Sequence, residues 1–192
     1  MNNSDLELID SILKGNKYAL DILVRKHYKT IYCYVYRNIG DESLSYDLTQ
    51  EIFIKVIKNI KSFNSDKEFK YWMLKVALNH CRDYFKSKSF KEFSHLELKE
   101  EIKEDNNIID FLEKKENTKR IKDALMKLPE VQREAIIFKY YNDMKISEVA
   151  EVLDISHNTV KSRIYQGIKR LKGILIGGDD GDKKRDDKRR VF

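Results

Sequence analysis

The strongest chemical pattern in the chain is a predicted helix face that is basic and polar. Between Ile155 and Gly178 there are five basic residues and no acidic one: Lys161, Arg163, Lys169, Arg170 and Lys172. Cations of this kind neutralise phosphates and release counterions, while short polar side chains read base edges in the major groove. The polar side chains on this face are Asn158, Ser162, Tyr165 and Gln166. The pattern predicts DNA binding.

Two short helices are needed to position that face. The residues opposite it, Val160, Ile164, Ile168 and Leu171, recur at the spacing of a buried helical stripe. A second helix is predicted over 145–153, and the connection Asp154-Ile155-Ser156 has the length found in a helix-turn-helix. We expect Ala150 at the helix crossing and Ser156 as the cap of the second helix. A solvated basic helix in a bundle is the alternative, but few such helices follow a capped turn and a matching support helix.

A second pattern interleaves cations with aromatic rings between Phe63 and Phe90. Such surfaces hold single-stranded nucleic acid, because cations follow the backbone and rings stack on bases. Phe69 and Trp72 also fit the spacing of buried residues, so Trp72 is equally well explained as core. The members expected to face solvent are Phe63, Asn64, Tyr71 and Asn79.

A third surface is predicted on the helix that begins near Ser43. Its polar face carries Asp47, Gln50, Glu51, Lys55 and Lys58, with Ile54 exposed among them. A polar face with one apolar anchor suits docking onto another protein. Taken alone, an ordinary solvated face explains it better.

The chain as a whole is predicted to be all-α. Among 192 residues there are only 7 Gly and 1 Pro, and long periodic apolar segments separate them. Capping boxes at Ser4–Glu7 and Ser65–Glu68 open the first and fourth of four predicted helices, and Pro129 suits the first turn of a later one. We expect a helical domain at 1–88, an acidic linker at 89–117, a helix-turn-helix domain at 118–176 and a disordered tail at 177–192.

The remaining composition excludes several classes of protein. The net charge of +6 slightly favours binding to polyanions. Cys33 and Cys81 form no CxxC pair, so we expect two buried thiols and no metal or other cofactor. The N-terminus is acidic where a signal peptide would be basic, and no apolar stretch is long enough to span a membrane. These features predict a cytoplasmic protein without membrane insertion.

Several segments resemble a known family. Asp47 to Phe53, Ser62-Phe63 and Phe69 to Asp83 resemble the second region of bacterial sigma factors. Leu128 to Arg133, Ser147 to Leu153 and Asn158 to Arg163 resemble their fourth region. Nothing between these blocks resembles the third domain of the larger housekeeping type. The chain is therefore similar to the extracytoplasmic-function (ECF) group of the sigma-70 family.

The resemblance implies a non-enzymatic subunit that directs RNA polymerase to promoters. Its expected partners are core RNA polymerase, promoter DNA and, as is usual in this group, an anti-sigma factor. The residues implied for docking on the clamp helices of the largest polymerase subunit are Asp47, Gln50, Glu51, Ile54 and Lys55. Those implied for the −10 element are Phe63, Asn64, Trp72, Lys75 and Asn79. Those implied for the −35 element are Asn158, Lys161, Ser162, Arg163, Tyr165 and Gln166.

Two positions depart from the family pattern. Asp154 replaces the usual glycine of the turn, and because Asp tolerates a left-handed conformation we expect a cost of about 1 kcal/mol or less. Gln166 stands where many relatives carry Arg. Since Arg favours guanine and Gln favours adenine, we expect a different base preference there.

Three other functions compete with this interpretation. A stand-alone helix-turn-helix repressor or activator would bind palindromic DNA as a dimer. An enzyme acting on nucleic acid would need paired carboxylates or a metal cluster, which the sequence does not suggest. A purely protein-binding adaptor is the third possibility, and loss of DNA binding after replacing Lys161 and Ser162 with alanine would argue against it.

Overall fold

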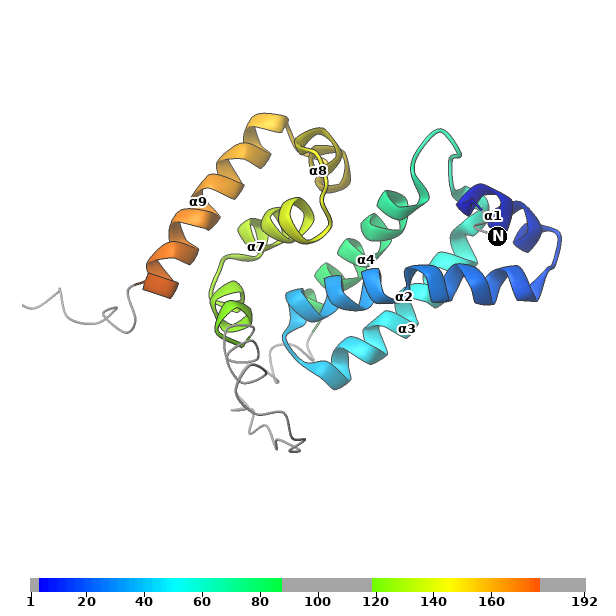
Figure 1. Ribbon diagram of the computed structural model, residues 1–192, viewed down its shortest axis with the longest axis horizontal. Helices are drawn as coiled ribbons and strands as arrows, with labels where there is room; N and C mark the ends of the chain where they lie inside the picture. Colours follow the sequence, from blue (N-terminus) through cyan, green and yellow to red (C-terminus); the bar gives the residue numbers. More distant parts are fainter. Residues whose placement is uncertain (1–3, 88–118, 177–192) are drawn as a thin grey trace, which may run out of the picture.

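The described part of the chain is helical throughout. The computed structural model describes residues 4–87 and 119–176, and within these ranges it contains no strand. The N-terminal group comprises α1 (Asp5–Leu13), α2 (Lys17–Ile39), α3 (Glu42–Asn59), η1 (Ile60–Ser62) and α4 (Phe69–Lys86). The C-terminal group comprises a helix at 119–126, α7 (Glu130–Ile136), the π-helical turn η2 (Ile137–Tyr141), α8 (Ile146–Leu153) and α9 (His157–Ile176) (Figure 1). The all-α fold class is confirmed.

Local sequence signals account for most helix ends of the N-terminal group. Ser4 and Glu7 form the predicted capping box, and Gly40 ends α2 in the left-handed conformation with φ of 83°. The predicted box at Ser65–Glu68 is wrong, because α4 begins at Phe69 without a side-chain cap. The Asn64 side chain instead accepts a hydrogen bond from the Asp66 backbone N–H, at 3.0 Å. This turn competes with the helix and delays its start.

The helix-turn-helix forms as predicted. Asp154 ends α8 with φ of 56° and ψ of 52°, the left-handed conformation that was expected of it. The Ser156 hydroxyl accepts a hydrogen bond from the Thr159 backbone N–H at 3.1 Å, so Ser156 caps α9. Pro129 stands one position earlier than expected, as the N-cap residue of α7.

A glycine allows α9 to lie close against α7. A Cβ atom at Gly167 would meet Ile136 Cδ1 at 2.6 Å and Gln132 Cβ at 3.3 Å. A side chain at this position would require the end of Ile136 to shift, because real Cβ atoms do not approach other atoms so closely. The side chains of α7 therefore lie within reach of the neighbouring turns of α9.

The two helical groups pack against each other. Helix α4 contacts α8, while α2 contacts α7 and η2, and the rings of Tyr34 and Phe138 stack across the contact at 5.0 Å. Both side chains are fully buried, so one apolar core runs through both groups. The predicted linker and tail lie outside the described residues, and the predicted domain boundaries stay predictions.

The two thiols differ in burial. Cys81 is buried on α4, as expected, whereas Cys33 is only half-buried, so its expected burial is wrong. No helix among residues 4–87 and 119–176 is long and apolar enough to cross a membrane.

Candidate functional site

The outer face of α9 presents the residues predicted to read DNA. Asn158, Lys161, Ser162, Tyr165 and Gln166 are all exposed, and Arg163 is half-exposed. The ring of Tyr165 is 70% exposed and is therefore free to contact a partner. Val160 and Ile164 are buried on the opposite side, while Ile168 is partly buried. Helix geometry thus separates a packed stripe from an acid-free face of polar and basic side chains.

Three side chains of this region are joined by hydrogen bonds. Gln132 Nε2 on α7 donates to Gln166 Oε1 at 3.2 Å, and Gln166 Nε2 donates to Ser162 Oγ at 3.3 Å. Gln132 is buried, whereas Gln166 and Ser162 are exposed. No local sequence pattern predicts this pairing, because the two glutamines lie 34 positions apart on different helices.

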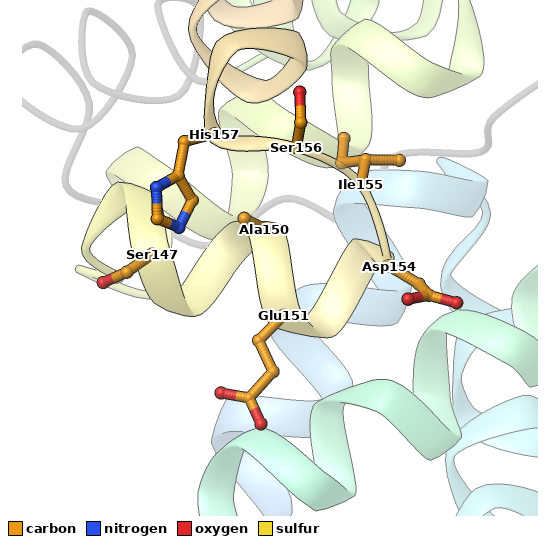
Figure 2. A pocket seen from close by; sticks show the side chains of 7 residues that line it. All are labelled: Ser147, Ala150, Glu151, Asp154, Ile155, Ser156 and His157. Carbon is orange, nitrogen blue, oxygen red and sulfur yellow. The ribbon is translucent and has the colours of Figure 1, made fainter.

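A shallow pocket lies where α8 turns into α9. Figure 2 shows Ser147, Ala150 and Glu151 from α8 beside Asp154, Ile155, Ser156 and His157 of the turn and the start of α9. Glu151 forms an ion pair with Lys67 of the N-terminal group. The pocket therefore lies at the turn between α8 and α9, beside the contact between the two helical groups.

The residues predicted for the −10 element gather at the start of α4. Phe63 packs edge-on against Phe69 at 5.2 Å and lies 5.6 Å from Trp72, measured between ring centroids. Phe69 is buried, whereas Phe63 and Trp72 are half-buried. Trp72 is thus both a core residue and partly accessible to a partner.

The polar members of this set face outward. Asn64, in the turn before α4, and Lys75 and Asn79, on α4 itself, are exposed. Tyr71 is half-buried, so its expected exposure is only partial. Half-accessible rings beside exposed amides and a cation can stack on and hold unpaired bases.

The residues predicted to dock on polymerase form one exposed face of α3. Asp47, Gln50, Glu51, Ile54 and Lys55 are all exposed, and Ile54 is 51% exposed. Ile52, Phe53 and Val56 point into the core from the other side of the same helix. An isolated apolar side chain among charges is the expected form of an anchor for a partner protein.

A buried histidine links the α3 face to α4. His80 Nδ1 lies 2.7 Å from Lys55 Nζ, and His80 Nε2 lies 2.8 Å from Glu51 Oε2. Since the ammonium group can only donate, Nδ1 accepts and Nε2 carries the proton. Burial lowers the pKa of His80, and the charge of Lys55 lowers it further. His80 is therefore neutral at physiological pH and accepts a hydrogen bond from Lys55, while Nε2 faces the Glu51 carboxylate.

Ionic contacts tie the two groups together, and the sequence did not predict them. Arg82 on α4 donates two hydrogen bonds to Glu134 on α7, at 2.8 and 2.7 Å. Lys70 donates to the Asn142 carbonyl at 3.1 Å, and Lys67 pairs with Glu151. These cations were expected to face nucleic acid. In this arrangement they contact the C-terminal group instead.

No group of three or more His, Cys, Asp or Glu side chains that could hold a metal ion occurs in the described ranges 4–87 and 119–176. The surfaces above can instead bind a polyanion and a protein through hydrogen bonds, ion pairs and ring stacking.

Comparison with known families assigns both groups of helices. Residues 23–90 match the family described as Sigma-70 region 2, and residues 118–171 match Sigma-70, region 4. The first match contains α3 and all of α4, and the second contains α7, α8 and α9 as far as Leu171.

Whole-chain relatives carry the same two regions. The chain is 28% identical over 176 residues to the ECF RNA polymerase sigma factor SigW of Bacillus subtilis, covering 87% of this chain and 94% of the relative. It is 25% identical over 172 residues to the ECF RNA polymerase sigma-E factor of Escherichia coli, covering 85% of this chain and 90% of the relative.

Two solved structures have the same fold. CnrH, in complex with the cytosolic domain of CnrY, aligns with a TM-score of 0.66 and 23% identity, over 92% of this chain and 99% of CnrH. The sigma factor RpoE from Bartonella quintana, in complex with the anti-sigma factor NepR, aligns with a TM-score of 0.63 and 18% identity. The alignment covers 81% of this chain and 95% of RpoE. The two region matches and the similarity to whole-chain ECF sigma factors show that the chain belongs to the ECF group of the sigma-70 family.

Proposed function

We propose that this protein directs RNA polymerase to specific promoters by binding core polymerase and the −10 and −35 elements together. The observation that carries the proposal is the presence, in one chain of this family, of three separate exposed surfaces. These are the acid-free face of α9, the rings and amides at the start of α4, and the polar face of α3. A transcription initiation factor of this kind works in the cytoplasm, where polymerase and DNA are.

The −35 element is read by α9. Lys161 and Arg163 neutralise phosphates, while Asn158, Ser162, Tyr165 and Gln166 reach base edges or the T methyl group. Support for these roles comes from the exposure of the whole set on one face and from the capped turn that lets the N-terminal part of a recognition helix enter the major groove.

The −10 element is held as a separated strand by the region around α4. An unpaired base stacks against the exposed parts of Phe63 and Trp72, while Asn64, Lys75 and Asn79 bind its edge and the neighbouring backbone. Phe69 is buried beneath the two rings and keeps them in place. The half-burial of Phe63 and Trp72 supports this role, because a ring must be fixed and accessible to receive a base.

Promoter binding requires the two groups to separate. The two promoter elements are centred about 25 base pairs apart, which is about 85 Å along B-form DNA at 3.4 Å per base pair. Helix α4 packs against α8, the helix that precedes α9, so the −10 surface of α4 and the −35 surface of α9 are held too close together to reach both elements at once. Separation would also free Lys67 and Lys70 for phosphate contacts.

An anti-sigma factor is the expected inhibitory partner. The solved structure of Bartonella RpoE contains such a factor, and a partner of this kind would prevent polymerase binding. We expect it to cover the α3 face, because Ile54 and the charges around it are the docking surface that polymerase needs.

Polymerase binding tests the proposal directly. Replacing Asp47 and Gln50 with alanine should abolish co-elution with core polymerase in size-exclusion chromatography while leaving the circular dichroism spectrum unchanged. The matched control replaces Asp21 and Lys29, two exposed residues of α2, and should co-elute normally. Unchanged binding by the α3 variant would remove the docking assignment. Failure of the wild-type protein to bind polymerase, together with dimeric binding to palindromic DNA, would favour a repressor.

A further inference from the structure

The side chain of Gln132 on α7 is buried, but its amide is hydrogen-bonded to a residue on the exposed face of α9. Gln132 is 6% exposed, and its Nε2 donates to Gln166 Oε1 on α9. Its Oε1 is buried and has no hydrogen-bond partner among the described residues. A buried amide costs free energy unless it is hydrogen-bonded. Within residues 4–87 and 119–176, its bond to Gln166 is the one side-chain hydrogen bond of Gln132.

The packing of α7 on α9 brings this bond about. Gly167 follows Gln166 in sequence, and the missing side chain lets α9 approach until Gln132 Cβ lies 3.3 Å from where a Cβ of residue 167 would stand. Gln132 therefore meets α9 at the turn that carries Gln166. The position of the amide is set by helix packing and not by a flexible surface contact.

The hydrogen bonds favour one orientation of the Gln166 amide. Its oxygen accepts from Gln132 and its nitrogen donates to Ser162. The reversed chain would place Gln132 Nε2 where its Oε1 now has no hydrogen-bond partner, and an unpaired buried N–H group is less well tolerated than an unpaired carbonyl oxygen. A carboxamide oxygen has two lone pairs and the nitrogen has two protons. After both internal bonds, one acceptor site and one donor remain for DNA. Adenine presents the complementary pair in the major groove, an N6 donor and an N7 acceptor.

From this geometry we infer that Gln132 is a positioning residue that sets the base preference of Gln166 at the −35 element. The inference rests on the proposed function and adds a specificity determinant from outside the recognition helix. The order of donor and acceptor along the groove differs between an A·T and a T·A pair. An amide held in one orientation selects one of them, whereas a reversed amide selects the other.

Two substitutions separate orientation from packing. In Gln132→Glu the carboxylate can only accept, so the Gln166 nitrogen must turn toward it, and its oxygen then accepts from the Ser162 hydroxyl. In Gln132→Met the side chain keeps its length but makes no hydrogen bond, so the Gln166 amide is free to rotate. The control Ile136→Val removes a methyl group from the same α7–α9 contact and leaves the three-residue chain of hydrogen bonds untouched.

The experiment is run-off transcription by core polymerase with the full-length protein on promoters randomised in the −35 element. At the base pair read by Gln166, Gln132→Glu should reverse the preference between A·T and T·A, and Gln132→Met should lose it. A bidentate contact discriminates by about 1–3 kcal/mol, so the change should be about fivefold or more. Ile136→Val should keep the wild-type ranking. In a Gln166→Ala background, changes at Gln132 should have no further effect on preference.

The outcomes distinguish this inference from the proposed function. If wild-type protein supports no initiation at defined promoters, the proposed function fails. If wild type shows a clear −35 preference and folded Gln132→Met keeps that preference unchanged, the positioning role is wrong. A loss of activity that is equal on all −35 sequences would likewise overturn it, because that is the result of a purely structural role.

Discussion

The ion pair between Arg82 and Glu134 is predicted to be the strongest single polar link between the two helical groups. Both carboxylate oxygens of Glu134 accept from the Arg82 guanidinium, at 2.8 and 2.7 Å, and the Glu134 side chain is only 3% exposed. Burial raises the pKa of Glu134, while the guanidinium opposes this rise. Removing Arg82 would leave a buried carboxylate without its counter-ion.

The size of the effect follows from this geometry. Removing one partner of a buried ion pair costs about 3–5 kcal/mol. The Arg82 side chain is 29% exposed, so water can reach the carboxylate after truncation, and we expect the low end, about 3 kcal/mol. The double variant Arg82→Met with Glu134→Leu removes both charges and should lie within about 1 kcal/mol of wild type. The coupling free energy should therefore be about 2 kcal/mol or more.

The assay is urea unfolding at neutral pH, followed by circular dichroism and by the fluorescence of Trp72, the single tryptophan of the chain. Trp72 belongs to the N-terminal group and Glu134 to the C-terminal group, so a Glu134 variant that shifts the Trp72 transition reports coupling across the contact. The cost of the single variant Arg82→Met should shrink toward acidic pH, because Glu134 then takes up a proton. Purely additive losses from the single variants, with coupling below about 0.5 kcal/mol, would refute the reasoning.

Three further predictions concern single sites. Gly167→Ala should lower the free energy of unfolding by about 1 kcal/mol, because the overlap of its Cβ with Ile136 Cδ1 outweighs the helix propensity that alanine adds. In the Ile136→Val background, which lacks that atom, Gly167→Ala should cost less than in wild type; an equal cost in both backgrounds would contradict the packing assignment. The His80 pKa is lowered from 6.5 in the folded protein, so the unfolded chain takes up the proton first as pH falls. The contribution of neutral His80 to the free energy of unfolding should be fully present above about pH 6.5 and be lost as the pH falls below it. In denaturation series between about pH 7 and 5, the free energy of unfolding of His80→Gln should depend less on pH than that of wild type; an equal pH dependence in both proteins would contradict this. Burial raises the pKa of Cys81 to about 12, so a thiol reagent at pH 8 should modify half-buried Cys33 in the native protein and Cys81 only after unfolding, as mass spectrometry of the labelled chain can check.

Much of the fold could be predicted because its signals are local. Ser156 needs only its neighbours in sequence to cap α9, and Asp154 adopts the left-handed conformation for reasons contained in its own short side chain. The exposed sets on α3 and α9 follow from helix periodicity alone. Capping failed at Ser65, where Asn64 formed a turn of its own that the pattern did not reveal.

The contacts between distant segments could not be predicted in the same way. Lys67 and Lys70 looked like nucleic-acid ligands because nothing in the sequence shows that Glu151 and the Asn142 carbonyl lie opposite them. Gln132 likewise belonged to a recognisable motif, but its partner Gln166 is defined only by the way α7 crosses α9. Pairings of this kind depend on tertiary packing, which a single sequence does not encode in any local pattern.

The central claim is tested most directly by single-round run-off transcription with purified core polymerase and a pool of promoter fragments, with start sites mapped by sequencing. Addition of the wild-type protein should create initiation at a small set of defined positions, each preceded by a shared −10 and −35 pair. Replacing Lys161 and Ser162 together should abolish initiation at these positions while polymerase binding persists. Start sites that stay as scattered as those of core polymerase alone would contradict the account.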